Sequence, residues 1–126
     1  MARDARAEKV RASGQSNTFN CPAPAGFVSV MLRSALPDPL MKKFSGVAMP
    51  GERFNAGDVG EPGAGFLFVW NRQSRWIMAI ERGGIVTRFS VQVFRLSHDG
   101  KSAVDLTPIQ GGWIDPCPLA LKYARQ

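Results

Sequence analysis

Two cysteines stand near opposite ends of this 126-residue chain, and a bond between them would tie those ends together. Cys21 and Cys117 are each followed by proline, which places both on stiff backbone outside strands. A disulfide between them would close a loop of about 100 residues and stabilise the fold by about 4 to 5 kcal/mol through chain entropy. Disulfides persist in oxidising compartments, so we predict a periplasmic or secreted protein of bacterial type whose signal peptide has been removed. The alternative is a cytoplasmic protein with two free thiols.

A single histidine, His98, stands beside Asp99, and such a pair could in principle serve acid–base chemistry. Both residues fall in a predicted hairpin turn, where a solvated pair is the better interpretation. Zinc or copper would need further His or Cys ligands, which are lacking while the cysteines pair. We therefore predict no catalytic residue, no metal and no cofactor. A small hydrolase-type enzyme using carboxylates such as Asp58 and Glu61 is the least favoured alternative.

Basic side chains are concentrated on the predicted sheet, within a formal net charge of +6. The residues Gly65-Phe66-Leu67-Phe68-Val69 overlap part of an aromatic strand motif by which some RNA-binding sheets stack bases. Ala64 stands where that motif needs a basic residue, and a role in the core explains these aromatics better. The alternative function is a basic domain that binds single-stranded nucleic acid through a basic face. That face would consist of Arg72, Arg75, Arg88 and Arg95.

The segment 46–65 is rich in glycine and proline, and it is long for a structureless loop inside a compact domain. Long loops on rigid sheets often carry recognition, so we predict a contact loop. Its candidate contact residues are Glu52, Arg53, Asp58 and Glu61. The favoured function is a non-catalytic binding or interaction module. Its partner would be another protein or an anionic ligand, and nucleic acid is possible but not favoured.

The stretch from Gly65 to Thr107 contains runs of Val, Ile, Phe and Trp that are broken by short polar or glycine-containing turns. This pattern predicts an α+β fold, mainly β, with an antiparallel sheet of about five strands. We expect a first strand near 26–32 and a C-terminal meander, together with short helices at about 39–45 and 116–124. The meander strands are expected at 66–71, 75–82, 85–96 and 102–107. After the meander, Trp113 and Ile114 read as a short apolar anchor.

Side chains alternate between the two faces of a strand, so the sequence also predicts which residues share a core. We expect one face of the sheet to carry two aromatic and aliphatic triplets, with helices covering the other face or an end. The pattern slips at Phe94, which predicts a nearby bulge or a strand end buried on both faces. The two triplets are Phe66, Phe68 and Trp70, and Trp76, Met78 and Ile80.

The length predicts a single globular domain over residues 19–126, preceded by a flexible or weakly helical segment at 1–18. No apolar run approaches the roughly 20 residues that a membrane-spanning helix needs, so we predict no transmembrane segment. The pattern does not indicate an oligomeric state.

Overall fold

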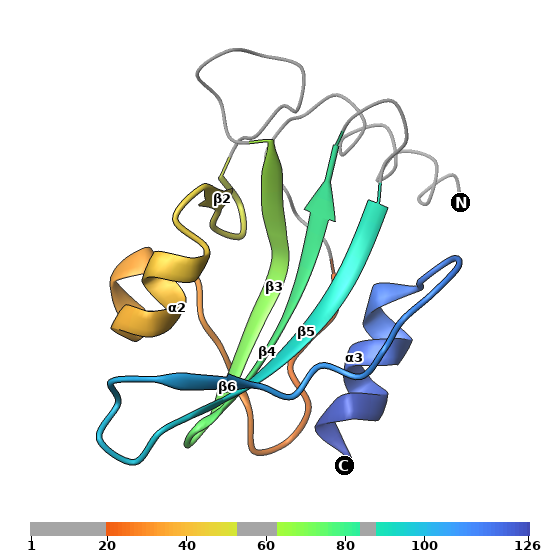
Figure 1. Cartoon of the computed structure of the whole chain (residues 1–126). Coiled ribbons are helices and arrows are strands. Elements are labelled where there is room, and N and C mark those ends of the chain that lie inside the picture. Colours follow the sequence, from red (N-terminus) through yellow and green to blue (C-terminus); the bar gives the residue numbers. More distant parts are fainter. Residues whose placement is uncertain (1–19, 53–62, 84–87) are drawn as a thin grey trace.

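A computed structural model describes residues 20–52, 63–83 and 88–126 of the chain (Figure 1). The fold is α+β and mainly β, as the sequence predicts, with six strands and two short α-helices in the described residues. The predicted segment 1–18 lies outside them. The strands are β1 (Val28–Ser29), β2 (Val47–Ala48), β3 (Ala64–Arg72), β4 (Arg75–Arg82), β5 (Arg88–Leu96) and β6 (Ala103–Asp105). The helices are α2 (Asp38–Lys43) and α3 (Pro116–Ala124), with a 3₁₀ turn η1 (Arg33–Ala35).

The sheet has the order β1-β3-β4-β5-β6, and every neighbouring pair in this order is antiparallel. The predicted meander β3 to β6 is therefore confirmed. The short strand β2 was not predicted, and it pairs in parallel with Ala64 and Gly65 of β3. Because the other edge of β3 is taken by β4, β2 lies on the same edge as β1. It raises the strand number from about five to six.

The last strand, β6, is shorter than the predicted range 102–107. Beyond Asp105 the chain still follows β5, but Thr107 pairs with it through its side chain. The backbone N–H of Leu106 donates to the carbonyl oxygen of Val93 at 2.8 Å. The Thr107 hydroxyl oxygen then accepts from the Val93 N–H at 2.9 Å. The edge of β5 is thereby covered by a segment that is not itself a strand.

A bulge at Leu67 divides the predicted aromatic triplet of β3 between the two faces of the sheet. Phe66 pairs with Ile80 and Phe68 pairs with Ala79, so Leu67 is an extra residue on β3. Phe66 therefore joins one core, while Phe68 and Trp70 join the other. The prediction that both triplets share one core was wrong for these two residues.

The bulge is in β3 and not beside Phe94, where β4 and β5 keep a regular register from Arg75↔Arg95 to Arg82↔Arg88. Phe94 packs in one core while its neighbour Val93 packs in the other. The second of the two predicted explanations is therefore right, because this end of β5 is buried on both faces.

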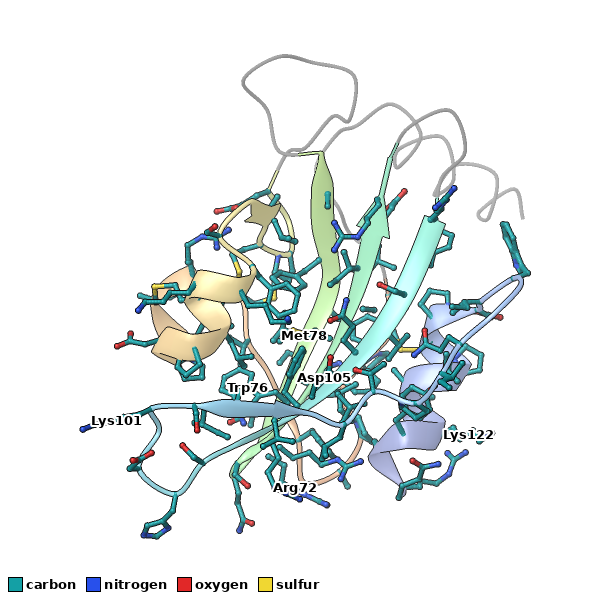
Figure 2. All side chains as sticks on the ribbon, in the orientation of Figure 1. Arg72, Trp76, Met78, Lys101, Asp105 and Lys122 are labelled. Carbon is teal, nitrogen blue, oxygen red and sulfur yellow. A yellow bond between two sulfur atoms is a disulfide. The ribbon has the colours of Figure 1, made fainter. Side chains whose placement is uncertain are left out.

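The two helices cover opposite faces of the sheet (Figure 1). Leu40 of α2 and Phe44, which directly follows α2, pack with Phe66. Trp76 and Met78 lie on this same side of the sheet (Figure 2). Ala120 and Tyr123 of α3 pack in a second core on the other side. The expectation that both helices sit on one face or at an end was wrong. The sheet is apolar on both faces, and each face requires its own cover.

Candidate binding groove

The predicted disulfide between Cys21 and Cys117 is present, with the two Cα atoms 5.9 Å apart. Cys117 lies in the first turn of α3, and Cys21 precedes β1 and is buried in the core beneath α3. The bond therefore fixes the beginning of α3 to the segment that leads into the sheet.

The end of α3 is held by an arginine of the sheet. The Arg75 guanidinium donates through Nη2 to the backbone carbonyl oxygen of Tyr123 at 2.8 Å. The last carbonyl groups of a helix lack helical partners and carry partial negative charge, so a cation is favoured there. Together with the disulfide, this bond fixes α3 at both ends.

The connection between β6 and α3 is held by the side chain of Gln110, which takes the place of a strand residue beside β5. Its amide oxygen accepts from the Val91 N–H at 3.3 Å, and its Nε2 donates to the Val91 carbonyl oxygen. The same Nε2 lies 3.2 Å from the Tyr123 hydroxyl oxygen. Gln110 thus joins the connection, the edge of the sheet and α3.

A groove of about 570 Å³ lies between this connection and α3. Trp113 is 81% exposed on its rim and makes an edge-to-face contact with Phe89, with the ring centroids 6.4 Å apart. Ile109 is fully exposed. The predicted apolar anchor at Trp113 and Ile114 is therefore wrong for Trp113, since Ile114 alone packs against the core. The groove is lined by Pro108, Ile109, Gln110, Gly111, Trp113, Ile114, Asp115, Pro118, Leu119, Lys122, Tyr123 and Gln126.

The groove carries opposite charges at its two ends. Asp115 is the residue before α3, and Lys122 is in its last turn, where Figure 2 shows it on the helix beside the C-terminus. Arg125 follows α3 and is exposed. Lys122 is therefore the cation that lines the C-terminal end of the groove.

The structure divides the predicted basic face. Arg72, Arg75 and Arg95 share the α3 side of the sheet at one end, where Arg75 is the strand partner of both other residues. Arg88 lies at the other end of β5 and on the α2 side, roughly 23 Å from Arg95 at about 3.3 Å per residue. The four arginines do not form one surface.

Two of these arginines are engaged within the fold. The Arg72 guanidinium carbon lies 4.8 Å from the centre of the Phe27 ring, a cation–π contact. Arg75 is bound to Tyr123, as described above. This leaves Arg88 and Arg95 as the exposed cations without such a partner among the described residues, and of these Arg95 lies on the α3 side.

Of the four predicted contact residues of the loop, only Glu52 lies within the described residues. Its carboxylate accepts a hydrogen bond from the Met49 N–H at 2.8 Å, which closes the turn after β2. Arg53, Asp58 and Glu61 lie outside the described ranges, so their role as contact residues stays a prediction.

The part of the chain that the structure describes contains no group of His, Cys, Asp and Glu side chains able to hold a metal ion. His98 is exposed in the β5–β6 hairpin. None of the helices in the described ranges combines the length and apolar character needed to cross a membrane. Comparison with protein-family models, curated proteins and solved structures finds no match.

Trp113 and Ile109 are the residues that sequence reasoning missed as candidate contacts. The signal for them is their setting, because Trp113 follows Gly111 and Gly112, and Gly112 adopts a positive φ of 68°. A tryptophan behind such a turn, outside any alternating or helical pattern, has no element that would bury it.

Proposed function

We propose that this chain is a non-catalytic binding module of an exported protein. Its groove beside α3 would bind a segment of another protein, and that segment would combine apolar residues with acidic ones. The observation that supports this proposal is the exposure of Trp113 and Ile109 on the rim of a groove of about 570 Å³. Apolar residues gathered at a concave site are typical of a surface that a partner covers.

Trp113 is the expected centre of the contact. Tryptophan is enriched among the few interface residues that contribute most of the binding free energy. The groove is also held in place by the disulfide, by Arg75 and by Gln110. Binding therefore requires little ordering of the groove itself, and preorganisation of this kind favours affinity.

Charge indicates the chemistry of the partner. Lys122 lines one end of the groove, Arg125 is exposed directly after α3, and Arg95 is exposed beside Arg75, which binds the end of α3. An acidic group on the bound segment would be attracted to this end, while Asp115 at the other end would disfavour it. Export is supported by the disulfide, because such bonds are rare in reducing compartments.

The proposal is tested by selecting peptides from a random phage-displayed library on the oxidised protein. We expect selected peptides to combine apolar and acidic residues. Trp113→Ala should weaken their binding at least tenfold, since it removes the exposed ring. Leu32→Ala is the matched control, because Leu32 is 68% exposed at the opposite edge of the sheet. Equal binding to the wild type and to Trp113→Ala would contradict the proposal.

The compartment is tested separately by counting free thiols in protein isolated from its native host without reductant. Absence of free thiols is the expected result, whereas two free thiols would support a cytoplasmic protein and remove export from the proposal.

Nucleic-acid binding through the basic face is the alternative from the sequence, and it predicts retention on a single-stranded oligonucleotide that falls steeply with salt. The geometry gives it less support, because Arg72 and Arg75 are engaged within the fold and Arg88 lies apart. A hydrolase using Asp58 and Glu61 stays a prediction, since both residues lie outside the described ranges.

A further inference from the structure

A second cavity, of about 360 Å³, lies on the opposite side of the sheet from the groove. It is formed where the chain leaves α2 and enters β2, beside the end of β4 and the middle of β5. Its walls come from segments far apart in the sequence, and most of the lining side chains can form hydrogen bonds or carry charge. They are Lys43, Phe44, Gly46, Val47, Arg82 and Gln92.

Positive charge surrounds this cavity. Lys43 and Arg82 are both exposed, and among the described residues neither forms a salt bridge. Arg88 is the strand partner of Arg82 and lies on the same face. Arg33 donates to the carbonyl oxygens of Phe44 and Val47, which both line the cavity. Two cations from two segments therefore line the cavity, and Arg88 lies on the same face of the sheet.

Neutral hydrogen-bonding groups lie beside these cations. Gln92 is half-buried and lines the cavity, and its strand partner is Met78. Ser90 is on the same strand and face, two residues before Gln92 and two after Arg88. Its hydroxyl oxygen is buried and has no hydrogen-bond partner in the described residues. Buried hydroxyl groups without a partner are uncommon in folded proteins, and this one lies behind the lining residue Gln92 on the same face.

A carboxylate on this face belongs to Asp105 of β6, the strand partner of Phe94. Its oxygen accepts a hydrogen bond from the Thr107 N–H at 2.9 Å. The Thr107 hydroxyl and N–H lower the pKa of Asp105, and the charge of Lys43 contributes a smaller part in the same direction. The ring of Phe94 lies below Lys43, with Nζ 5.8 Å from its centre. Asp105 is therefore held by Thr107, and Lys43, which also contacts the Phe94 ring, lines the cavity.

We propose that this cavity binds a small ligand through an oxyanion group, a carboxylate or a phosphate. The planar guanidinium of Arg82 suits such a group because its two N–H donors match two oxygens, and Lys43 adds a compact positive charge. The Gln92 amide would donate to the same group, and Phe44 and Val47 provide an apolar wall for the rest of the ligand. This site is independent of the groove beside α3, from which the sheet separates it.

The experiment is calorimetric titration of the oxidised protein with inorganic phosphate and with succinate, at constant ionic strength set with sodium chloride. Saturable binding of one equivalent is expected for at least one of the two, and the preferred anion identifies the group as phosphate or carboxylate. Arg82→Gln and Lys43→Gln should each weaken binding about tenfold or more, as for loss of a charge-assisted hydrogen bond. The matched control is Lys101→Gln, because Lys101 points away from the sheet at the tip of the β5–β6 hairpin (Figure 2).

Gly46→Leu tests the site without changing charge. A Cβ built at Gly46 meets no atom within 4 Å, and the residue lines the cavity, so a larger side chain can occupy the space. We expect this variant to fold with an unchanged melting temperature and to lose anion binding. No saturable binding of either anion to the wild type would overturn the inference, as would equal weakening by Lys101→Gln. Trp113→Ala should bind the anion normally, which separates this inference from the proposed function.

Discussion

Arg75 and Tyr123 are joined by a hydrogen bond of 2.8 Å although 48 residues separate them in the chain. The donor is a guanidinium at the start of β4, and the acceptor is a carbonyl oxygen in the last turn of α3. This single contact places the C-terminal end of α3 against the sheet, and the disulfide does the same for its beginning. The geometry of the groove depends on both.

Replacing Arg75 by methionine keeps the length of the side chain and removes the donor. We expect the free energy of unfolding to fall by about 1 to 2 kcal/mol, the usual net value of a hydrogen bond involving a charged group. Urea denaturation followed by tryptophan fluorescence measures it. Arg88→Met is the control, because Arg88 is exposed at the other end of the sheet, and it should change stability by less than about 0.5 kcal/mol. Equal effects of the two variants would remove the structural role of Arg75.

Replacing both cysteines by alanine removes a bond that closes a loop with a sequence separation of 96 residues. The free energy of unfolding should fall by about 4 kcal/mol, because the unfolded chain gains conformational freedom. Guanidinium denaturation with and without reductant is the measurement. Reductant should lower the midpoint of the wild type and leave that of the double variant unchanged. A wild-type midpoint that does not respond to complete reduction is the contrary result.

Two tryptophans should respond in opposite ways to truncation. Trp70 is completely buried and stacks on Phe68, with the ring centroids 4.4 Å apart. Trp70→Ala should therefore cost about 3 to 5 kcal/mol of stability. Trp113→Ala should change stability by less than about 0.5 kcal/mol, because its ring is exposed. Thermal unfolding of both variants decides this. A large loss of stability in Trp113→Ala would assign its ring to the core instead of to a contact surface.

Stability should depend on pH partly through Asp105. Its pKa is lowered in the folded protein by the Thr107 hydroxyl and N–H, so the unfolded chain binds the proton more readily. The contribution is thus fully present above the unfolded pKa of about 3.9 and is lost as the pH falls through the lower folded pKa. Asp105→Asn should reduce stability above pH 4 and approach the wild type in stronger acid. Denaturation midpoints across this range measure it.

The control for Asp105 is Asp115→Asn, since the Asp115 side chain makes no capping hydrogen bond at the start of α3. Asp115→Asn should lose stability with falling pH as steeply as the wild type does. If both variants reduce this dependence of stability on pH equally, the contact between Asp105 and Thr107 is not its cause.

Local patterns predicted much of this fold, because short-range chemistry determines the features concerned. The observed α3 (Pro116–Ala124) matches the predicted helix, since Asp115 and Pro116 mark its beginning. Asp99-Gly100 predicted the β5–β6 turn, and Gly100 adopts the positive φ of 76° that this turn requires. The disulfide followed from residue type and context.

What the sequence did not predict depends on contacts between distant segments. One extra residue at Leu67 moves Phe68 to the other face, and nothing in the local pattern marks it. The helices cover opposite faces because both faces of β3 and β4 are apolar, and such strands do not specify which helix covers which face. The second cavity joins Lys43 and Arg82, which only the path of the chain brings together.

The disulfide also decides how the domain responds to mechanical load. Cys21 and Cys117 enclose, in one covalent loop, the six strands that the described residues form. If an anchor pulled on the chain before Cys21 while a partner pulled on the end of α3, the tension would pass through the sulfur–sulfur bond. The contacts of α3 with the sheet would yield first, and the bond would then keep the strands between Cys21 and Cys117 from being extended. A module joined to its surroundings at its two ends would keep its sheet intact for as long as that bond stays oxidised.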